Sequence, residues 1–320
     1  MRRWSRDELV AGIRAKDRNA LARAITLAES ERADHRALAS EVIAAFPAHL
    51  RTRRLGISGT PGVGKSTFIE SFGLALCGAG ASVAVLAVDP TSVVSGGSIL
   101  GDKTRMEELV RHPQAFIRPS PSGGTLGGVA RRTREAILLC EAFGFDYVLV
   151  ETVGVGQSEV AVSRLTDCFL MLLQPGAGDD LQGIKRGILE LVDLVVVTKA
   201  DGANKALADA ATHHYRQALH ILRTEEHPPA VLACSALERS GLSEIKETID
   251  LFYRRRAPEL AQRRQVQQRH FFDELLLEGL RAWFGQRVGE DVIEAQRAAI
   301  GSGESSIEQG LEALLGKLAP

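Results

Sequence analysis

The chain has 320 residues, 45% of them hydrophobic and 25% charged, as is typical of one large or two ordinary globular domains. With 39 basic and 40 acidic side chains the formal charge is −1, so we expect no broad electrostatic attraction to nucleic acid or to a membrane surface. No apolar run reaches the roughly 18 residues of a membrane-spanning helix. The charged N-terminus does not resemble a secretory signal, and four isolated cysteines are typical of buried thiols in a reducing compartment. We therefore expect a cytoplasmic protein.

Residues 1–50 are expected to form a small helical extension packed on the main domain. Ser5 and Glu8 have the spacing of a capping box, in which each side chain accepts a hydrogen bond from the other residue's backbone N–H. Apolar residues then recur at helical spacing, and the pattern continues until Pro47.

Residues 51–240 have the pattern of an α/β domain. Six short apolar runs, separated by helical stretches, are expected to be strands at 55–58, 83–88, 147–150, 168–173, 194–198 and 230–234. Because their apolar character is nearly continuous, they indicate a mostly parallel sheet covered by helices on both faces.

Residues 241–320 are expected to be helical again. Apolar residues recur at helical spacing over 241–256 and 259–287, and the glycines at 301 and 303 precede a last short helix over 306–318. Long helices outside an α/β domain often bury an apolar stripe against a second subunit. We therefore expect a C-terminal dimerisation region and a homodimer.

The strongest motif follows the first expected strand and has the pattern GxxxxGK[ST] of a phosphate-binding loop. Its glycines let successive N–H groups point at phosphate oxygens, and the next helix presents its positive end to the same anion. Lys65 supplies charge for the β- and γ-phosphates, and Ser66 supplies a hydroxyl for Mg²⁺. The expected phosphate-binding residues are Gly59, Thr60, Pro61, Gly62, Val63, Gly64, Lys65, Ser66 and Thr67.

Three carboxylates are candidates for the magnesium site and for catalysis. Glu151 ends an apolar run, and the sequence from Glu151 to Gly154 is similar to the DxxG motif of GTPases with Glu in place of Asp. Gly154 is expected to donate its N–H to the γ-phosphate. Asp89 ends the second expected strand, and Asp102 lies in a glycine-rich stretch suited to a mobile lid. Ser66, Asp89, Asp102 and Glu151 are the expected metal-site residues, and Lys65 with the three carboxylates forms the expected catalytic set.

The base is expected to be guanine. Thr198, Lys199 and Asp201 end another strand with the pattern TKxD, which is similar to the guanine signature NKxD. An aspartate here can accept hydrogen bonds from the N1–H and the amine of guanine, whereas adenine would leave it unpaired. Thr198 replaces the usual Asn of this motif. The sequence does not show which contact takes the place of those that the Asn side-chain amide would make. Ser235, Ala236 and Leu237 are similar to a loop whose backbone N–H contacts guanine O6.

Two features concern turnover and its control. Val155, not Gln, follows Gly154, so the water-positioning Gln of many GTPases is missing at its usual place, and Gln157 is a possible substitute. We expect slow intrinsic hydrolysis that a partner accelerates by ordering the loops. The segment 174–185 combines glycines with charges and is expected to transmit the nucleotide state to the partner, through Gln174, Gly176, Asp179, Asp180 and Lys185.

These motifs together resemble the methylmalonyl-CoA mutase-associated GTPases of the MeaB/ArgK type. The runs GGSILGDKTRM and QPGAGDDLQGIK are more specific to this family than the phosphate loop, which many other proteins share. The matching motifs span residues 56–237. The resemblance implies a P-loop G domain of the signal-recognition/MinD-like class and a homodimer joined partly by C-terminal helices. It also implies a weak Mg²⁺-dependent GTPase that docks on an adenosylcobalamin-dependent methylmalonyl-CoA mutase. There it would gate cofactor loading and protect the enzyme from inactivation.

Three other functions remain open from the sequence. A nickel-delivering GTPase would need clustered thiolates or imidazoles, and the adjacent His213 and His214 have no cysteine nearby. A small-molecule kinase would transfer phosphate to a substrate other than water. A structural dimer would bind nucleotide without hydrolysing it.

Overall fold

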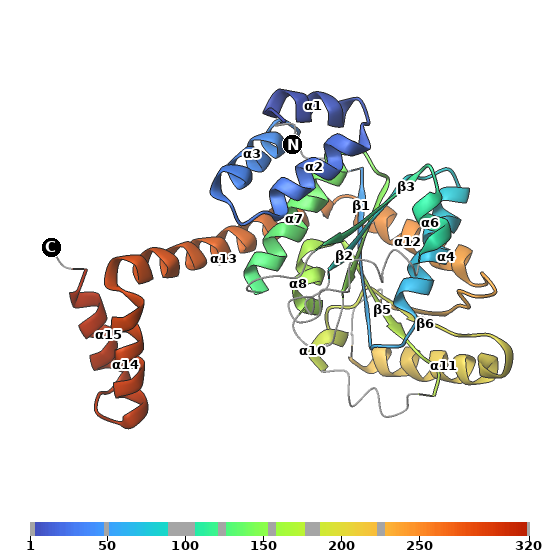
Figure 1. Cartoon of the computed structure of the whole chain (residues 1–320). Helices are drawn as coiled ribbons and strands as arrows, with labels where there is room; N and C mark the ends of the chain where they lie inside the picture. The colour runs from blue at the N-terminus through green and yellow to red at the C-terminus, as the bar shows by residue number, and fades with distance from the viewer. Residues whose placement is uncertain are drawn as a thin grey trace. The chain divides into compact units, whose positions relative to one another are not determined.

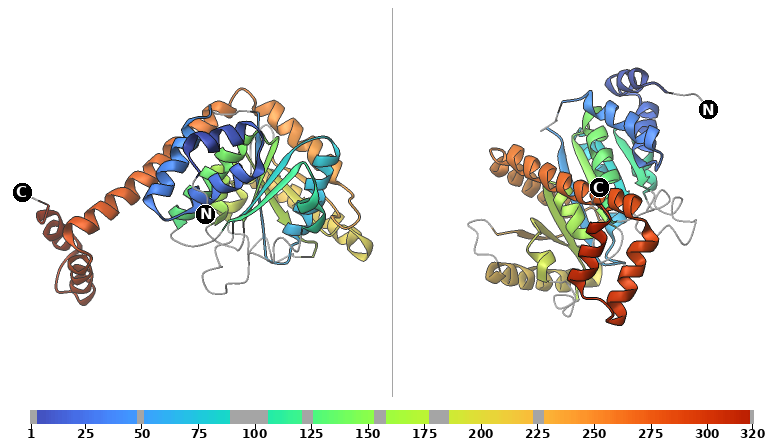
Figure 2. Two further views of the ribbon diagram at one scale, coloured as in Figure 1. Left: turned by 45° about the horizontal axis from the view of Figure 1, so that its top comes forward. Right: turned by 90° about the vertical axis from the view of Figure 1, so that its left-hand side faces the viewer.

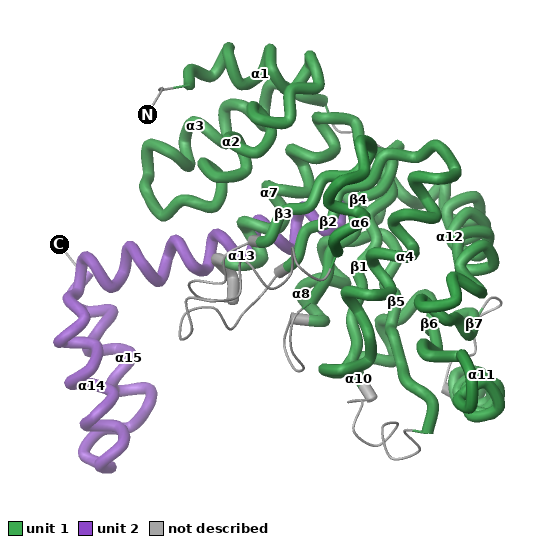
Figure 3. The backbone as a smooth tube through the Cα atoms, turned by 45° about the vertical axis from the view of Figure 1, so that its right-hand side comes forward, with its two compact units in different colours: residues 1–264 green, residues 265–320 purple. Residues whose placement is uncertain are grey.

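The computed structural model describes residues 4–47, 51–88, 106–120, 126–152, 158–176, 186–222 and 228–318. They form two compact units, residues 1–264 and 265–320 (Figure 3). In the described parts of the chain no helix is both long and apolar enough to span a bilayer.

The first unit is built on a parallel sheet (Figure 1). Among the described residues it has seven strands, in the order β3-β2-β4-β1-β5-β6-β7. All neighbouring strands pair in parallel. The strands are β1 (Arg53–Gly59), β2 (Val83–Val88), β3 (Ala115–Ser120), β4 (Tyr147–Thr152), β5 (Cys168–Leu173), β6 (Leu194–Val197) and β7 (Ala230–Ala233). The expected mostly parallel α/β sheet is thereby confirmed.

The sequence did not predict β3, which lies at the edge of the sheet and pairs only with β2. Arg118 and Pro119 interrupt its apolar pattern. An edge strand tolerates both residues, because one of its sides makes no ladder hydrogen bonds and needs no donor from proline.

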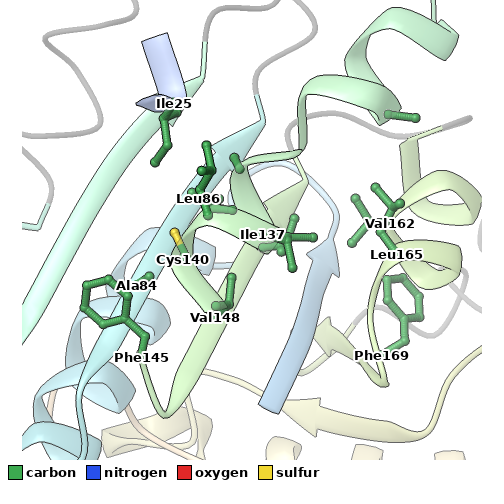
Figure 4. Close-up of a cluster of buried hydrophobic side chains, with 14 of the residues drawn as sticks. Ile25, Ala84, Leu86, Ile137, Cys140, Phe145, Val148, Val162, Leu165 and Phe169 are labelled. Atoms are coloured by element: carbon green, nitrogen blue, oxygen red, sulfur yellow. The ribbon is translucent and has the colours of Figure 1, made fainter. Parts of the chain in front are cut away.

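Helices cover both faces of the sheet because alternate strand residues point to opposite sides. In β4, Tyr147 and Leu149 join a cluster with α4 (Lys65–Gly78), α6 (Glu107–Arg111) and α12 (Leu242–Arg256). Val148, which Figure 4 labels, and Val150 join the opposite cluster. The helices of that cluster are α7 (Leu126–Phe143), α8 (Ser158–Leu165), α10 (Arg186–Leu189) and α11 (Lys205–Leu222), the last of which follows a short 3-10 turn, η1 (Gly202–Asn204).

Three N-terminal helices join that opposite cluster and lie beside α7 (Figure 2): α1 (Arg6–Arg14), α2 (Arg18–Glu29) and α3 (Ala33–Ala44). Both halves of the expected capping box are present, with the Ser5 hydroxyl accepting from Glu8 N and the Glu8 carboxylate accepting from Ser5 N at 2.9 Å. The helical extension expected before Pro47 is thus present.

The second unit consists of helices. It contains all but the first turn of α13 (Leu260–Val288), together with α14 (Glu290–Ser302) and α15 (Ile307–Gly316). The helix expected over 259–287 matches α13 to within one residue at each end, whereas α14 was not predicted; the two helices meet at Gly289, which has a φ of 96°. At Gly310 an added Cβ would lie 2.7 Å from Ile300, so the glycine permits close packing of α15 on α14.

A buried cluster of charges fixes the first turn of α13, which belongs to the first unit. Arg264 donates to both carboxylate oxygens of Asp167, at 2.9 and 2.7 Å, and to Glu141 at 3.2 Å. Arg54 forms a two-point ion pair with Glu141, and the Tyr253 hydroxyl donates to Asp167. Asp167 and Glu141 are almost fully buried, so each depends on these arginines for compensation of its charge.

Replacing Arg264 tests this cluster. Arg264→Met leaves Asp167 buried without its charge partner, and we expect the free energy of unfolding to fall by about 3–5 kcal/mol. Urea denaturation followed by circular dichroism measures the loss. The control is Arg32→Met, which removes an exposed ion pair with Asp34 and should leave the unfolding curve close to wild type. Equal curves for the two variants would contradict the assigned role.

Candidate nucleotide-binding site

The site lies at the carboxyl edge of the sheet, around β1. In the strand register Gly59 of β1 is level with Leu172 of β5, and Ile57 is level with Glu151 of β4. In the sheet, β1 lies between β4 and β5. The strands β2 and β3 lie beyond β4, and β6 and β7 lie beyond β5, so the strand order reverses direction at β1. Ligands of open α/β sheets bind at such a point.

The phosphate loop begins at Gly59, where the backbone packs so closely that an added Cβ would lie 2.6 Å from the carbonyl oxygen of Leu172. The loop ends at Gly64, whose φ of 96° a side chain would strain, and α4 starts at the next residue. The first N–H groups of α4 therefore face the loop, as anion binding requires.

Lys65 folds back onto this loop. Its ammonium donates to the carbonyl oxygens of Gly59 at 2.7 Å and Thr60 at 3.3 Å. Partial burial lowers the pKa of Lys65, while the nearby carboxylates of Glu151 and Glu159 act in the opposite direction. Glu159, on α8, is almost fully buried and was not singled out from the sequence.

The Ser66 hydroxyl donates to Glu151 at 3.3 Å, and Glu151 is 3% exposed. The structure therefore brings together two of the four expected metal-site residues. A hydroxyl and a carboxylate are hard oxygen ligands of the kind that Mg²⁺ prefers, so this donor pair fits that ion. Asp89, Asp102, Gly154 and Gln157 lie outside the described residues.

The expected base-binding residues come together at the ends of β6 and β7. The Ser235 hydroxyl donates to Asp201 at 2.6 Å, which orients the half-buried carboxylate. Backbone hydrogen bonds join the two loops, with Ala200 N donating to Cys234 O at 3.0 Å. Leu237 is 78% exposed, so its side chain remains accessible at the end of this loop.

Thr198, which stands where the NKxD pattern has Asn, contacts the phosphate loop. Its buried hydroxyl lies 2.7 Å from the carbonyl oxygen of Val63, inside the phosphate loop, and 3.1 Å from that of Leu173. A threonine hydroxyl donates one hydrogen, so it can satisfy one of these acceptors at a time. Thr198 thus links the base-binding strand to the phosphate loop, a role that its position in the sequence did not reveal.

Lys199 makes a second link. Its backbone has a φ of 57°, and its ammonium donates to Gly62 O at 2.7 Å and to the side-chain oxygen of Gln174 at 3.2 Å. Gln174 and Gly176 are the described members of the expected partner-switch set. Asp179, Asp180 and Lys185 lie outside the described residues.

His213 and His214 are exposed on α11, where His213 contacts Gln217. In the portion of the chain that is described, no group of three or more His, Cys, Asp or Glu side chains could hold a metal ion. All four cysteines are buried, and burial together with nearby Asp201 raises the pKa of Cys234 to about 12. These thiols are therefore packing residues of the core.

The fold and the site define a P-loop nucleotide-binding protein with a guanine-type base loop. The family model described as "Methylmalonyl Co-A mutase-associated GTPase MeaB" matches residues 21–285. The chain belongs to this family and is a GTPase.

Similar proteins agree with this assignment. "GTPase ArgK" of Escherichia coli K12 is 54% identical over 245 residues, which are 76% of this chain and 74% of the relative. The mouse "Methylmalonic aciduria type A homolog, mitochondrial" is 47% identical over 289 residues, covering 86% and 70%. The crystal structure of an "LAO/AO transport system kinase" superposes with a TM-score of 0.79 at 39% identity, covering 99% of each chain.

Replacing Thr198 tests its link to the phosphate loop. Thr198→Val keeps the shape but removes the donor, and we expect affinity for GDP to fall about tenfold, which corresponds to about 1.4 kcal/mol. Thr198→Ser keeps the hydroxyl and should stay within about twofold of wild type. Isothermal titration calorimetry measures both variants. Unchanged affinity in Thr198→Val would show that the loop does not depend on this hydroxyl.

Proposed function

We propose that this protein is a GTP-hydrolysing chaperone that docks on an adenosylcobalamin-dependent methylmalonyl-CoA mutase, gates its cofactor loading and protects it from inactivation. The family description supports the choice of partner. The proposed nucleotide binding and hydrolysis are supported by one observation: the phosphate loop, Glu151 and Asp201 lie at the same edge of the sheet.

The phosphate loop supplies the charge for the triphosphate. Lys65 donates to two carbonyl oxygens of the loop. An ammonium binds a charged phosphate oxygen more strongly than a neutral carbonyl, so Lys65 would exchange these contacts for a bound γ-phosphate. The N–H groups at the start of α4 add donors and the positive end of the helix. Together they oppose the negative charge of the transferring phosphoryl group.

Ser66 and Glu151 would hold Mg²⁺, Ser66 directly and Glu151 through water. The ion would supply positive charge to the β- and γ-phosphate oxygens. The hydrogen bond between the two side chains supports this assignment because it places both oxygens at one point beside the loop. Asp89 and Asp102 remain proposed members of this site and of the catalytic set.

Asp201 would select guanine by accepting from its N1–H and amine, with Ser235 holding the carboxylate in place. Lys199 would lie along the base while it keeps its contact with Gly62. Its second contact, with Gln174, supports a path from the base loop to the segment 174–185. Nucleotide state can alter partner affinity only through contacts that differ between the two states, and we propose that this segment supplies them.

We also propose a homodimer formed through the second unit. Its helices expose large apolar side chains: Val266, Phe272, Leu276, Leu277, Leu280, Trp283, Ile307, Leu311 and Leu315. Leu276, Leu280 and Trp283 are separated by four and three residues and form one stripe along α13. Exposed apolar area of this kind marks an interaction site in soluble proteins.

Charged substitutions in the stripe test the dimer. Leu280→Glu with Trp283→Glu would bury two carboxylates in the interface, so we expect dissociation to monomers in analytical ultracentrifugation. Glu278→Gln, on the same helix, is the control and should remain dimeric. A monomeric wild type at micromolar concentration would contradict the proposed dimer.

Hydrolysis with and without the partner tests the function itself. We expect single-turnover phosphate release from GTP to be slow alone and at least tenfold faster with the mutase, because docking orders the loops around the γ-phosphate. Lys65→Ala should lose at least about a hundredfold in rate, since it removes charge that stabilises the transition state. Equal rates with and without mutase would contradict partner activation.

Labelled GTP separates this function from the kinase that the name of the structural relative suggests. Free phosphate as the product supports the GTPase, whereas a phosphorylated small molecule would support a kinase. Persistence of GTP over days would instead support a dimer that binds nucleotide without hydrolysing it.

A further inference from the structure

A buried serine on α4 connects the phosphate subsite to the base loop. The Ser71 hydroxyl donates to the carbonyl oxygen of Ala236 at 2.8 Å, and Ser71 is 8% exposed. The same helix begins at Lys65 beside the phosphate loop. One helix therefore touches both ends of the proposed nucleotide site.

Hydrogen bonds fix both peptide planes that flank Ala236. Ser240 N donates to Ser235 O at 3.0 Å, and Ser71 holds Ala236 O on the other side. In a planar trans peptide the N–H points opposite to the C=O. The N–H directions of Ala236 and Leu237 are thus set by these two contacts before any nucleotide binds.

We propose that Ser71 is a positioning residue for guanine recognition. By holding Ala236 O, it orients the backbone donors of the loop toward O6 of the base, and through α4 it sets their distance from the phosphate loop. Donors fixed in advance need no reordering when the ligand arrives, which raises affinity. This inference rests on the proposed GTP site and assigns a residue that the sequence motifs do not contain.

A purely structural role for Ser71 makes a different prediction. If the hydroxyl only stabilised the contact between α4 and the loop, its loss would lower the unfolding temperature and weaken all nucleotides by the same factor. A positioning role weakens nucleotides that carry an oxygen at C6 and spares those that do not.

Calorimetry with two nucleotides separates these roles. GDP carries O6 and an N1–H, whereas 2-aminopurine riboside diphosphate lacks both and keeps the 2-amine. For Ser71→Ala we expect affinity for GDP to fall about five- to tenfold and affinity for the analogue to change less than about twofold. Ser71→Thr keeps the donor and should restore GDP binding. Ser163→Ala removes a similarly buried hydroxyl, bonded to Val160 O within α8, and should change neither affinity.

Equal losses for both nucleotides in Ser71→Ala, or no loss for either, would overturn the positioning role. A wild-type protein that binds GDP and the analogue equally well would overturn the guanine site itself, so the two failures are distinguishable. Should Ser71→Ala not fold, Ser71→Cys carries the same comparison, because a thiol is a weak donor.

Discussion

The phosphate loop of this protein is held in shape from its flank by side chains of another strand. Thr198 contacts the carbonyl of Val63, and Lys199 donates to the neighbouring carbonyl of Gly62. Both side chains follow β6, two strands away from β1 in the sheet. The proposed phosphate-binding and base-binding residues are therefore parts of one hydrogen-bonded unit, in which a nucleotide that engages one part would meet the other already in position.

This unit extends to elements that sequence motifs do not include. Ser71 joins α4 to the loop after β7, and Lys199 reaches Gln174 after β5. Each contact joins residues that are at least 25 positions apart. The Lys199 contact gives Gln174 a physical connection to the proposed nucleotide site, as the proposed nucleotide control of a partner requires.

The sequence predicted much of the fold because its signals are local. Continuous apolar runs mark central parallel strands, and the phosphate-loop glycines are required by positive φ or close approach. The edge strand β3 was missed because an edge position permits the Arg and Pro that hide its pattern. The end of α13 was predicted to within one residue, but α14 was not singled out, because it has no buried apolar stripe whose spacing would mark it.

Contacts between distant residues could not be predicted in this way. Thr198 was a departure from a motif, and only the folded chain shows its hydroxyl at Val63. The partnership of Arg264 with Asp167 and Glu141 joins residues about a hundred positions apart, and no periodic pattern records it. Such pairs depend on how strands and helices align in three dimensions.

We propose above all that Asp201, whose carboxylate is held by Ser235, selects the purine. Calorimetric titration of the pure protein and of Asp201→Asn, with GDP, ADP and xanthosine diphosphate in the presence of magnesium, tests it most directly. We expect the wild type to bind GDP alone and the variant to exchange GDP for xanthosine diphosphate, because an amide donates to the extra carbonyl of xanthine. Equal binding of ADP and GDP by the wild type would contradict the account.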